Sequence, residues 1–235
     1  MNKKLMLLAA GVLTALAFSA LPSVASAGEY LATCKIGGVL SNECEGTIES
    51  TGNATLQDDS GGAAGRVTCT KTTGTVKQLN GKTTNTSSLT FTGCTSNGFS
   101  CNSTGQPTGT IITGNLTGDI VNIEPALETA PGLLLTNISV TFACAGGLVK
   151  KTVTGAVIGE LEQPYECGVF RSHHTVQFTE KTVGSGIQTP QQVTTAGSMF
   201  DLTVNNDAGG AYTTASQTGT AHINWAVNQT VAIDC

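Results

Sequence analysis

Hydrophobic and polar positions alternate with a period of two over many short stretches of this chain. In residues 88–92, for example, Leu89 and Phe91 alternate with hydroxyl residues. Such alternation is typical of a strand with one buried and one solvent-exposed face. From residue 66 onward, about ten such stretches are separated by glycine-rich turns, and no helical period is sustained. The pattern predicts an all-β fold, an antiparallel sandwich or barrel-like domain of about ten short strands stapled by disulfides.

The most informative stretch is a predicted β-hairpin. Asn97-Gly98 is a favoured pair for a tight turn, because both residues tolerate positive φ. Folding back on this turn pairs Thr95 with Ser100 and Cys94 with Cys101. Opposed strand residues lie about 4.5–5.5 Å apart at Cα, within the range of about 4.4–6.8 Å that a disulfide spans. We therefore predict a Cys94–Cys101 disulfide that clasps the hairpin; two free thiols are the alternative.

The first 27 residues have the features of a secretory signal peptide. Lys3 and Lys4 give a positive start, an apolar stretch follows, and Pro22 precedes the small residues Ala25-Ser26-Ala27. We expect cleavage near Ala27, a secreted or cell-surface protein, and no transmembrane segment in the mature chain. An uncleaved membrane anchor is the alternative.

All eight cysteines follow this leader and would meet an oxidising compartment, where disulfides persist. They are Cys34, Cys44, Cys69, Cys94, Cys101, Cys144, Cys167 and Cys235. An even number favours four bridges, although eight cysteines allow 105 pairings. Cys34–Cys44 is a plausible local loop, and the four cysteines outside this loop and the hairpin would connect distant segments. Because no C-x-x-C pair and no histidine at a ligand-like spacing occurs, we expect no metal or other cofactor.

Composition indicates a hydroxyl-rich surface with few charged residues. The chain has 38 threonines, which are β-branched and suit a pleated surface that faces solvent. Charged residues make up only 11 %, and removal of the leader lysines changes the formal net charge from −5 to −7. This acidic balance argues against nucleic acid and anionic membranes as partners. We divide the chain into a signal peptide (1–27), an irregular, disulfide-pinned N-terminal extension (28–65) and a single all-β domain (66–235).

Several motifs resemble a group of uncharacterised secreted, Thr- and Cys-rich all-β proteins of high-GC Gram-positive bacteria. The motifs are Leu89-Thr90-Phe91-Thr92-Gly93-Cys94 with Cys101, Gly109-Thr110-Ile111, Leu116-Thr117-Gly118, Phe142-Ala143-Cys144 and Thr154-Gly155-Ala156-Val157-Ile158-Gly159. The resemblance covers roughly residues 66–180. It implies export and a β fold, and it carries no catalytic residue over to this chain.

Candidate catalytic groups are few. The chain has no G-x-S-x-G, H-E-x-x-H or G-x-G-x-x-G motif. His173 and His174 are neighbours, so on a strand they would point to opposite faces. Glu160, Glu162 and Glu166 form an acidic cluster, which fits a solvated edge better than the paired carboxylates of a glycosidase. We assign no catalytic residue.

Two aromatic residues complete the candidates. Trp225 alternates with Ile223 and Val227, which favours a place in the core over a ligand platform. Tyr212, beside a glycine pair, is expected on an exposed loop and is our first candidate for a ligand contact. The sequence thus predicts an exported, non-enzymatic scaffold with an unknown extracellular or cell-wall ligand. A secreted hydrolase of wall or environmental polymers and a self-assembling surface protein are the alternatives.

Overall fold

The structure is a computed structural model that describes residues 31–59, 65–81, 83–123, 130–162, 165–190, 200–206 and 211–234. Its strands are β1 (Leu31–Ile36), β2 (Val39–Ser41), β3 (Glu43–Ser50), β4 (Ala54–Asp58), β5 (Arg66–Cys69), β6 (Lys71–Leu79), β7 (Thr83–Thr92), β8 (Thr95–Ser96), β9 (Phe99–Ser103), β10 (Ile111–Ile112), β11 (Leu116–Ile123), β12 (Ala130–Cys144), β13 (Val149–Leu161), β14 (His173–Glu180), β15 (Gln188–Thr189), β16 (Leu202–Asn205), β17 (Tyr212–Trp225) and β18 (Gln229–Asp234). A short 3-10 helix, η1 (Ala145–Gly147), joins β12 to β13. No helix in these ranges is long and apolar enough to cross a membrane.

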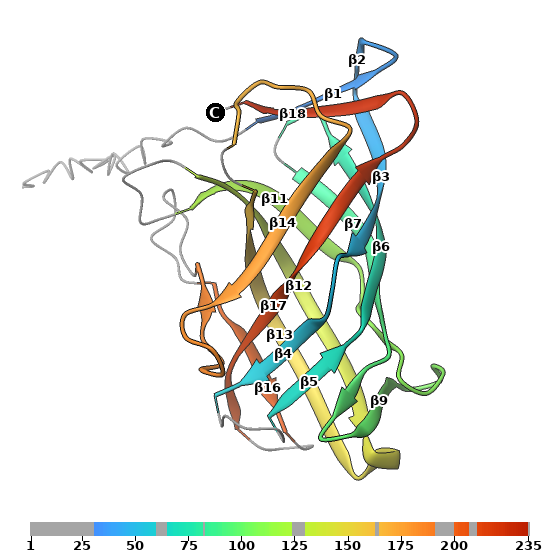
Figure 1. The fold of residues 1–235 in the computed structure, drawn as a ribbon, viewed down its shortest axis with the longest axis vertical. Coiled ribbons are helices and arrows are strands. Elements are labelled where there is room, and N and C mark those ends of the chain that lie inside the picture. The colour runs from blue at the N-terminus through green and yellow to red at the C-terminus, as the bar shows by residue number, and fades with distance from the viewer. Residues whose placement is uncertain are drawn as a thin grey trace, which may run out of the picture.

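Antiparallel pairing closes the sheet into an elongated barrel (Figure 1). At one end, eight strands follow one another around the wall in the order β12-β13-β14-β17-β3-β6-β7-β11 and back to β12. At the other end the closed order is β12-β13-β16-β17-β4-β5-β8-β9. The long strands β12, β13 and β17 belong to both ends. The all-β, barrel-like prediction is confirmed, whereas about ten strands was too few.

The period-two pattern separates the inside of the barrel from the outside. On β13, Val153 and Val157 are buried in the core, while Thr152 and Thr154 point outward. The outward hydroxyls pair between strands, as between Thr152 and Thr141 at 3.1 Å. Inside, three small hollows of about 70, 40 and 20 Å³ lie between apolar side chains. Each is far smaller than the roughly 300–1,000 Å³ of ordinary ligand pockets.

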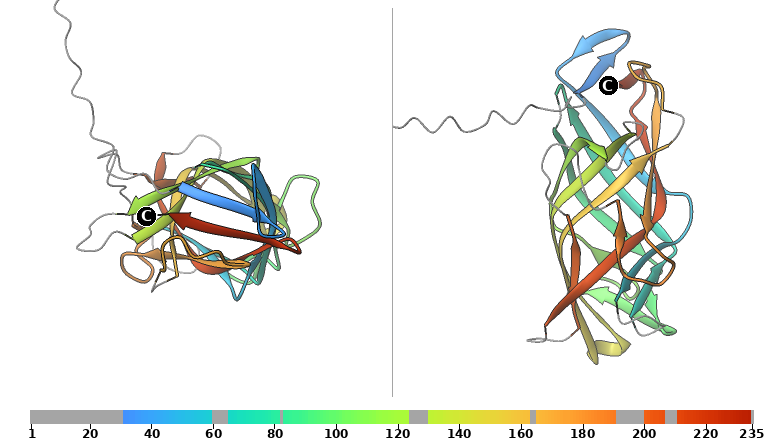
Figure 2. Two further views of the ribbon diagram at one scale, coloured as in Figure 1. Left: turned by 90° about the horizontal axis from the view of Figure 1, so that it is seen from above. Right: turned by 90° about the vertical axis from the view of Figure 1, so that its left-hand side faces the viewer.

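The predicted irregular N-terminal extension (28–65) is corrected, because four regular strands (β1 to β4) occupy most of residues 31–58. β3 and β4 are part of the barrel wall, and β1, β2 and β18 form a three-stranded sheet across its upper end (Figure 2). The inward residues of β3 include Cys44 and Gly46. Because these side chains are small or absent, β3 lacks the aliphatic alternation that marks a strand in sequence.

The predicted hairpin is present, but its disulfide is not the predicted one. Asn97 and Gly98 have φ of 49° and 80°, and Thr95 lies opposite Ser100. Four cysteines form a row across adjacent strands, and the bonds are Cys69–Cys94 and Cys101–Cys144.

The backbone register explains this correction. The amide of Cys101 donates to the carbonyl of Cys94 at 2.9 Å, so these residues form a hydrogen-bonded pair. In antiparallel sheets, the side chains of hydrogen-bonded pairs are farther apart than those of non-hydrogen-bonded pairs. Each hairpin cysteine instead bonds to its neighbour on the outer side of the hairpin, at Cα separations of 3.9 and 4.0 Å.

The other cysteines agree with a stapled framework. Cys34–Cys44 is a disulfide, as predicted, and it ties the sheet across the upper end to β3. Cys167 is also disulfide-bonded. Cys235 lies outside the described residues, so its predicted bridge stays a prediction.

Candidate functional site

A groove with a mixed polar and apolar lining lies on the outer wall near the upper end of the barrel. Its volume is about 890 Å³, within the range of ordinary ligand sites. The lining comes from β3, β6, β7, β11 and the end of β17: Glu45, Gly46, Thr47, Thr75, Val76, Lys77, Thr86, Asn115, Leu116, Thr117, Asn224, Trp225, Ala226 and Val227. Most of the side chains that point outward are hydroxyls and amides.

Strand register aligns three of these polar side chains in one row. Asn224 on β17 lies opposite Thr47 on β3, and Thr47 lies opposite Thr75 on β6. His173 on β14 continues the row, because it lies opposite Asn224. All four residues are exposed. The wall therefore presents a line of hydrogen-bonding groups that runs across four neighbouring strands.

Two irregularities of the wall shape the groove. A register shift between β6 and β7 places residues 87 and 88 opposite Thr75, which is the pattern of a β-bulge. Bulges bend a strand and increase its local twist. Gly46 is the second irregularity, because a Cβ there would lie 2.8 Å from the carbonyl oxygen of Asn224 and 3.0 Å from the Trp225 ring. The missing side chain allows Trp225 to pack directly on β3.

Two carboxylates and one ammonium group lie together at one side of the groove. The Lys77 ammonium donates to the Glu43 carboxylate at 2.9 Å and lies 3.9 Å from the Glu45 carboxylate. The hydrogen bond to Glu43 and its negative charge raise the pKa of Lys77. The three side chains are 42–67 % exposed, so solvent screens these pairs. Their formal net charge is −1.

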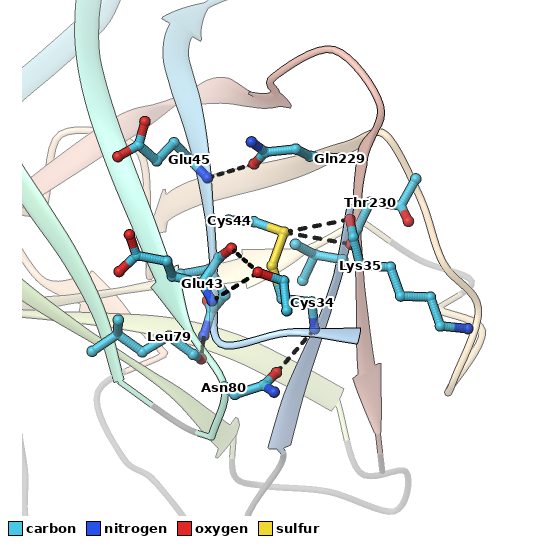
Figure 3. The surroundings of a disulfide bond; sticks show 12 residues. Cys34, Lys35, Glu43, Cys44, Glu45, Leu79, Asn80, Gln229 and Thr230 are labelled. Atoms are coloured by element: carbon cyan, nitrogen blue, oxygen red, sulfur yellow. Dashed lines mark hydrogen bonds between the residues drawn. A yellow bond between two sulfur atoms is a disulfide. The ribbon is translucent and has the colours of Figure 1, made fainter. Parts of the chain in front are cut away.

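The upper end of the groove is fixed by the neighbouring disulfide (Figure 3). Cys34–Cys44 joins β1 to β3, and the Cys34 amide donates to the Asn80 side chain at 3.1 Å. The Glu45 amide donates to the Gln229 side chain at 2.7 Å. These bonds hold β3 in place directly beside Glu45, so this edge of the groove needs little ordering on binding.

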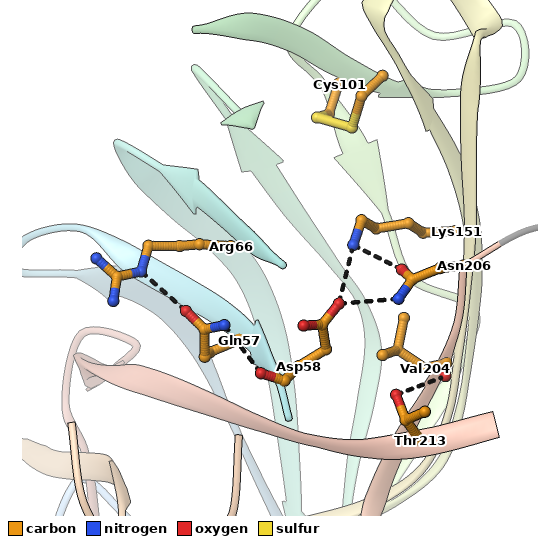
Figure 4. A network of polar contacts seen from close by, with 9 residues as sticks. Gln57, Asp58, Arg66, Cys101, Lys151, Val204, Asn206 and Thr213 are labelled. Carbon is orange, nitrogen blue, oxygen red and sulfur yellow. Dashed lines mark hydrogen bonds and ion pairs between the residues drawn. A yellow bond between two sulfur atoms is a disulfide. The ribbon is translucent and has the colours of Figure 1, made fainter. Parts of the chain in front are cut away.

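A buried ion pair stabilises the other end of the barrel (Figure 4). The Lys151 ammonium lies 3.3 Å from the Asp58 carboxylate and donates to the Asn206 side chain at 2.6 Å. The Asn206 amide also donates to Asp58, at 2.9 Å. The ion-pair side chains are 3 % and 1 % exposed, and each charge is compensated by the other. We assign this network to stability, because its donors and acceptors are directed at one another.

The adjacent histidines point to opposite faces, as predicted. His173 is exposed, whereas His174 is 5 % exposed and its Nε2 lies 3.2 Å from the Val231 carbonyl. Its ring stacks on Tyr165 and meets Trp225 edge-on. Burial lowers the pKa of His174 to about 4 and raises that of Tyr165 to about 12. Both groups are therefore neutral members of the core near pH 7.

The candidate catalytic groups are distributed over the outer wall. The Thr175 hydroxyl and His222 Nδ1 are 3.0 Å apart, and Glu49 lies opposite His222 in the register but pairs with Lys71 at 3.6 Å. Glu166 pairs with Arg171 at 3.1 Å. Of the other acidic residues, Glu160 lies opposite Gln177 and Glu162 is exposed. The side chains of His, Cys, Asp and Glu in the described ranges form no group of three that could hold a metal ion.

The two aromatic candidates lie far apart on β17. Trp225 is 8 % exposed, as predicted for a core residue, but Val227 is 88 % exposed because β17 ends at Trp225 and the chain turns at Asn228. Tyr212 is 52 % exposed, as expected, although it is the first residue of β17 rather than part of a loop. The two residues are separated by roughly 40 Å of strand. Tyr212 is therefore not part of the groove.

The groove was not among the sequence-based candidates. Thr47 and Thr75 lie on strands that are distant from Asn224 in the chain, and only the register brings the three together. The signal that the sequence does contain is local, namely a threonine that alternates with inward residues on each strand. Comparison with protein-family models, curated proteins and solved structures finds no match for this chain.

Proposed function

We propose that this protein is an exported, non-enzymatic β-scaffold that binds an extracellular or cell-wall ligand through its outer groove. The observation that carries the proposal is the groove itself, a concavity of about 890 Å³ with polar and apolar lining residues on the wall of a closed, disulfide-stapled barrel. Ligand sites are ordinarily concave and largely pre-formed. The predicted signal peptide and the resemblance to secreted proteins support export, and the disulfides are compatible with it.

The non-enzymatic part of the proposal is supported by how the charged groups are used. The buried Asp58 and Lys151 compensate each other, and Glu43 and Glu166 pair with exposed cations. Catalysis by a general base or a nucleophile needs a reactive side chain that is available to the substrate. These groups are instead occupied in contacts that hold the wall together.

A blocking substitution tests the proposal. In Thr47→Arg, a long side chain would fill the groove from its centre, whereas Thr141→Arg places the same side chain on the far wall, where Thr141 is exposed. The mature protein and both variants are incubated with insoluble cell-wall polymer, and the bound fraction is measured. We expect retention of the wild type and of Thr141→Arg, and loss of retention for Thr47→Arg. Equal retention of all three proteins would refute a role for the groove.

A second candidate function, self-assembly, is favoured by the β1–β2 hairpin. β2 is the outer strand of its sheet, and Val39 and Leu40 on it are 71 % and 65 % exposed. An uncharged edge strand is a ready template for pairing with another strand. Sedimentation over a range of concentrations tests this function. Oligomers that disappear in Leu40→Lys but persist in Val183→Lys, a control at another exposed valine, would support it.

A further inference from the structure

We infer that the groove binds a neutral, hydroxyl-rich chain, that is, an extended glycan without charged groups. The inference rests on the proposed binding function and specifies its ligand class. It is drawn from the chemistry of the groove, the spacing of its polar row and the apolar residues beside that row.

The chemistry of the groove matches a ligand that both donates and accepts hydrogen bonds. Threonine hydroxyls and asparagine amides each offer a donor and an acceptor, as sugar hydroxyls do. Thr47, Thr75 and Asn224 lie on one side of the groove, and Asn115 and Thr117 lie on the β11 side. The Thr117 hydroxyl also accepts a hydrogen bond from the Asn137 amide at 3.2 Å. A ligand rich in hydroxyls can exchange hydrogen bonds with groups of this kind without carrying a net charge.

Electrostatics disfavours the acidic alternative. The charged side chains of the groove are Glu45 and Lys77, which lie 3.9 Å apart, and Lys77 is also hydrogen-bonded to Glu43 at 2.9 Å, so these three groups carry a formal net charge of −1. Glu43 lies next to them, and the whole chain has a formal net charge of −5. An acidic polymer would find no unpaired cation here and would be repelled by the overall field. A neutral polymer pays neither penalty.

The spacing of the polar row matches an extended chain of sugars. Neighbouring strands lie about 4.8 Å apart, so Asn224, Thr47 and Thr75 repeat at about this distance across β17, β3 and β6. This repeat is close to the length of one sugar residue in an extended glycan. A glycan that crosses the strands at right angles would therefore meet one polar side chain for each sugar.

Apolar residues beside the row complete the match. Among the apolar lining residues, Val227 in the β17–β18 turn is 88 % exposed, whereas Val76 and Trp225 are 3 % and 8 % exposed. Sugar rings carry C–H faces as well as hydroxyls. A C–H face would cover Val227, while the hydroxyls reach the polar row.

Titration calorimetry with defined probes tests the ligand class. The mature protein is titrated with cellohexaose and maltohexaose as neutral chains, with a polygalacturonate hexamer as an acidic chain and with a Gly-Ser decapeptide as a neutral peptide. The variant Thr47→Val/Thr75→Val removes two hydroxyls and keeps β-branched side chains. The control Thr141→Val/Thr152→Val removes the exposed pair on the far wall, and urea unfolding verifies that both variants fold.

We expect at least one neutral hexasaccharide to bind. Each lost hydrogen bond should weaken binding about three- to tenfold, so the groove variant should bind about 10- to 100-fold more weakly and the control unchanged. Preferential binding of the acidic chain or the peptide, with the same dependence on Thr47, would overturn the ligand class and leave the binding function standing. A neutral glycan that binds both variants equally would overturn the groove assignment. Absence of binding to all four probes, together with failure of the cell-wall assay, would overturn both proposals.

Discussion

Acid should destabilise this protein through one buried histidine, and His174→Gln should remove the effect. His174 packs between Tyr165 and Trp225, and its Nε2 lies 3.2 Å from the Val231 carbonyl, which accepts its hydrogen bond. Glutamine can place an amide N–H near the same carbonyl, but it does not titrate. The substitution therefore separates the effect of protonating residue 174 from the effect of its packing and hydrogen bond.

The size of the effect follows from the lowered pKa. Desolvation, opposed by the bond to Val231 and assisted by the charges of Arg171 and His173, lowers the pKa of His174 from 6.5 to about 4. Above pH 6.5 the imidazole is neutral in both the folded and the unfolded protein, so the free energy of unfolding does not depend on its titration there. Below pH 6.5 the unfolded chain takes up a proton that the folded chain excludes, and stability falls until about pH 4. With about 1.36 kcal/mol per pKa unit, the free energy of unfolding falls by about 2 kcal/mol at pH 5.

Urea unfolding of both proteins at pH 7.5 and pH 5.0 measures this loss. The two proteins differ only at residue 174, so the difference between their losses isolates the contribution of His174. We expect the wild type to lose about 2 kcal/mol more than His174→Gln over this interval. Equal losses would show that His174 is protonated in the folded protein or remains buried in the unfolded one, and the assignment of a neutral core histidine would then be wrong.

Three further predictions concern the wall. Lys151→Met leaves the Asp58 carboxylate buried without its cation and should destabilise the fold by about 3–5 kcal/mol in urea unfolding, with much of the loss recovered in Asp58→Asn/Lys151→Met. Gly46→Ala forces a Cβ against the single tryptophan and should cost about 1–3 kcal/mol and shift its fluorescence; an unchanged spectrum and stability would contradict this packing. Non-reduced chymotryptic mapping, with cleavage after residue 99, should yield Cys94 and Cys101 in separate cross-linked peptides, and a peptide that joins the two would contradict the observed pairing.

The hairpin illustrates what a sequence can and cannot define. Asn97-Gly98 gave the turn and the Thr95–Ser100 pairing, because both depend on residues that are close in the chain. The disulfides depend on which cysteines lie on the outer sides of the hairpin. Cys69 and Cys144 reach those positions only through long-range strand pairing, which local spacing does not encode.

Barrel closure and the groove could not be predicted from the sequence for a related reason. Alternation identified individual strands and their outward threonines, but closure requires the register of every neighbouring pair. β3 was missed because its inward positions include Cys44 and Gly46 in place of aliphatic side chains. Gly46 is small because Trp225, almost 180 residues later, packs against it. The explanation for the residue thus lies in another strand, and no local window of the sequence contains it.

The distribution of the disulfides bears directly on the proposed binding function. Two bridges tie the hairpin to its neighbours near one end of the barrel, and Cys34–Cys44 ties the covering sheet to β3 at the other. Both ends of the wall are therefore cross-linked, and the groove lies beside the upper cross-link. Neutral hydrogen bonds contribute little each, about 0.5–1.5 kcal/mol, so a site built from hydroxyls and amides binds usefully only if few groups must be ordered. A stapled barrel meets that condition, because its wall holds the polar row in place before the ligand arrives.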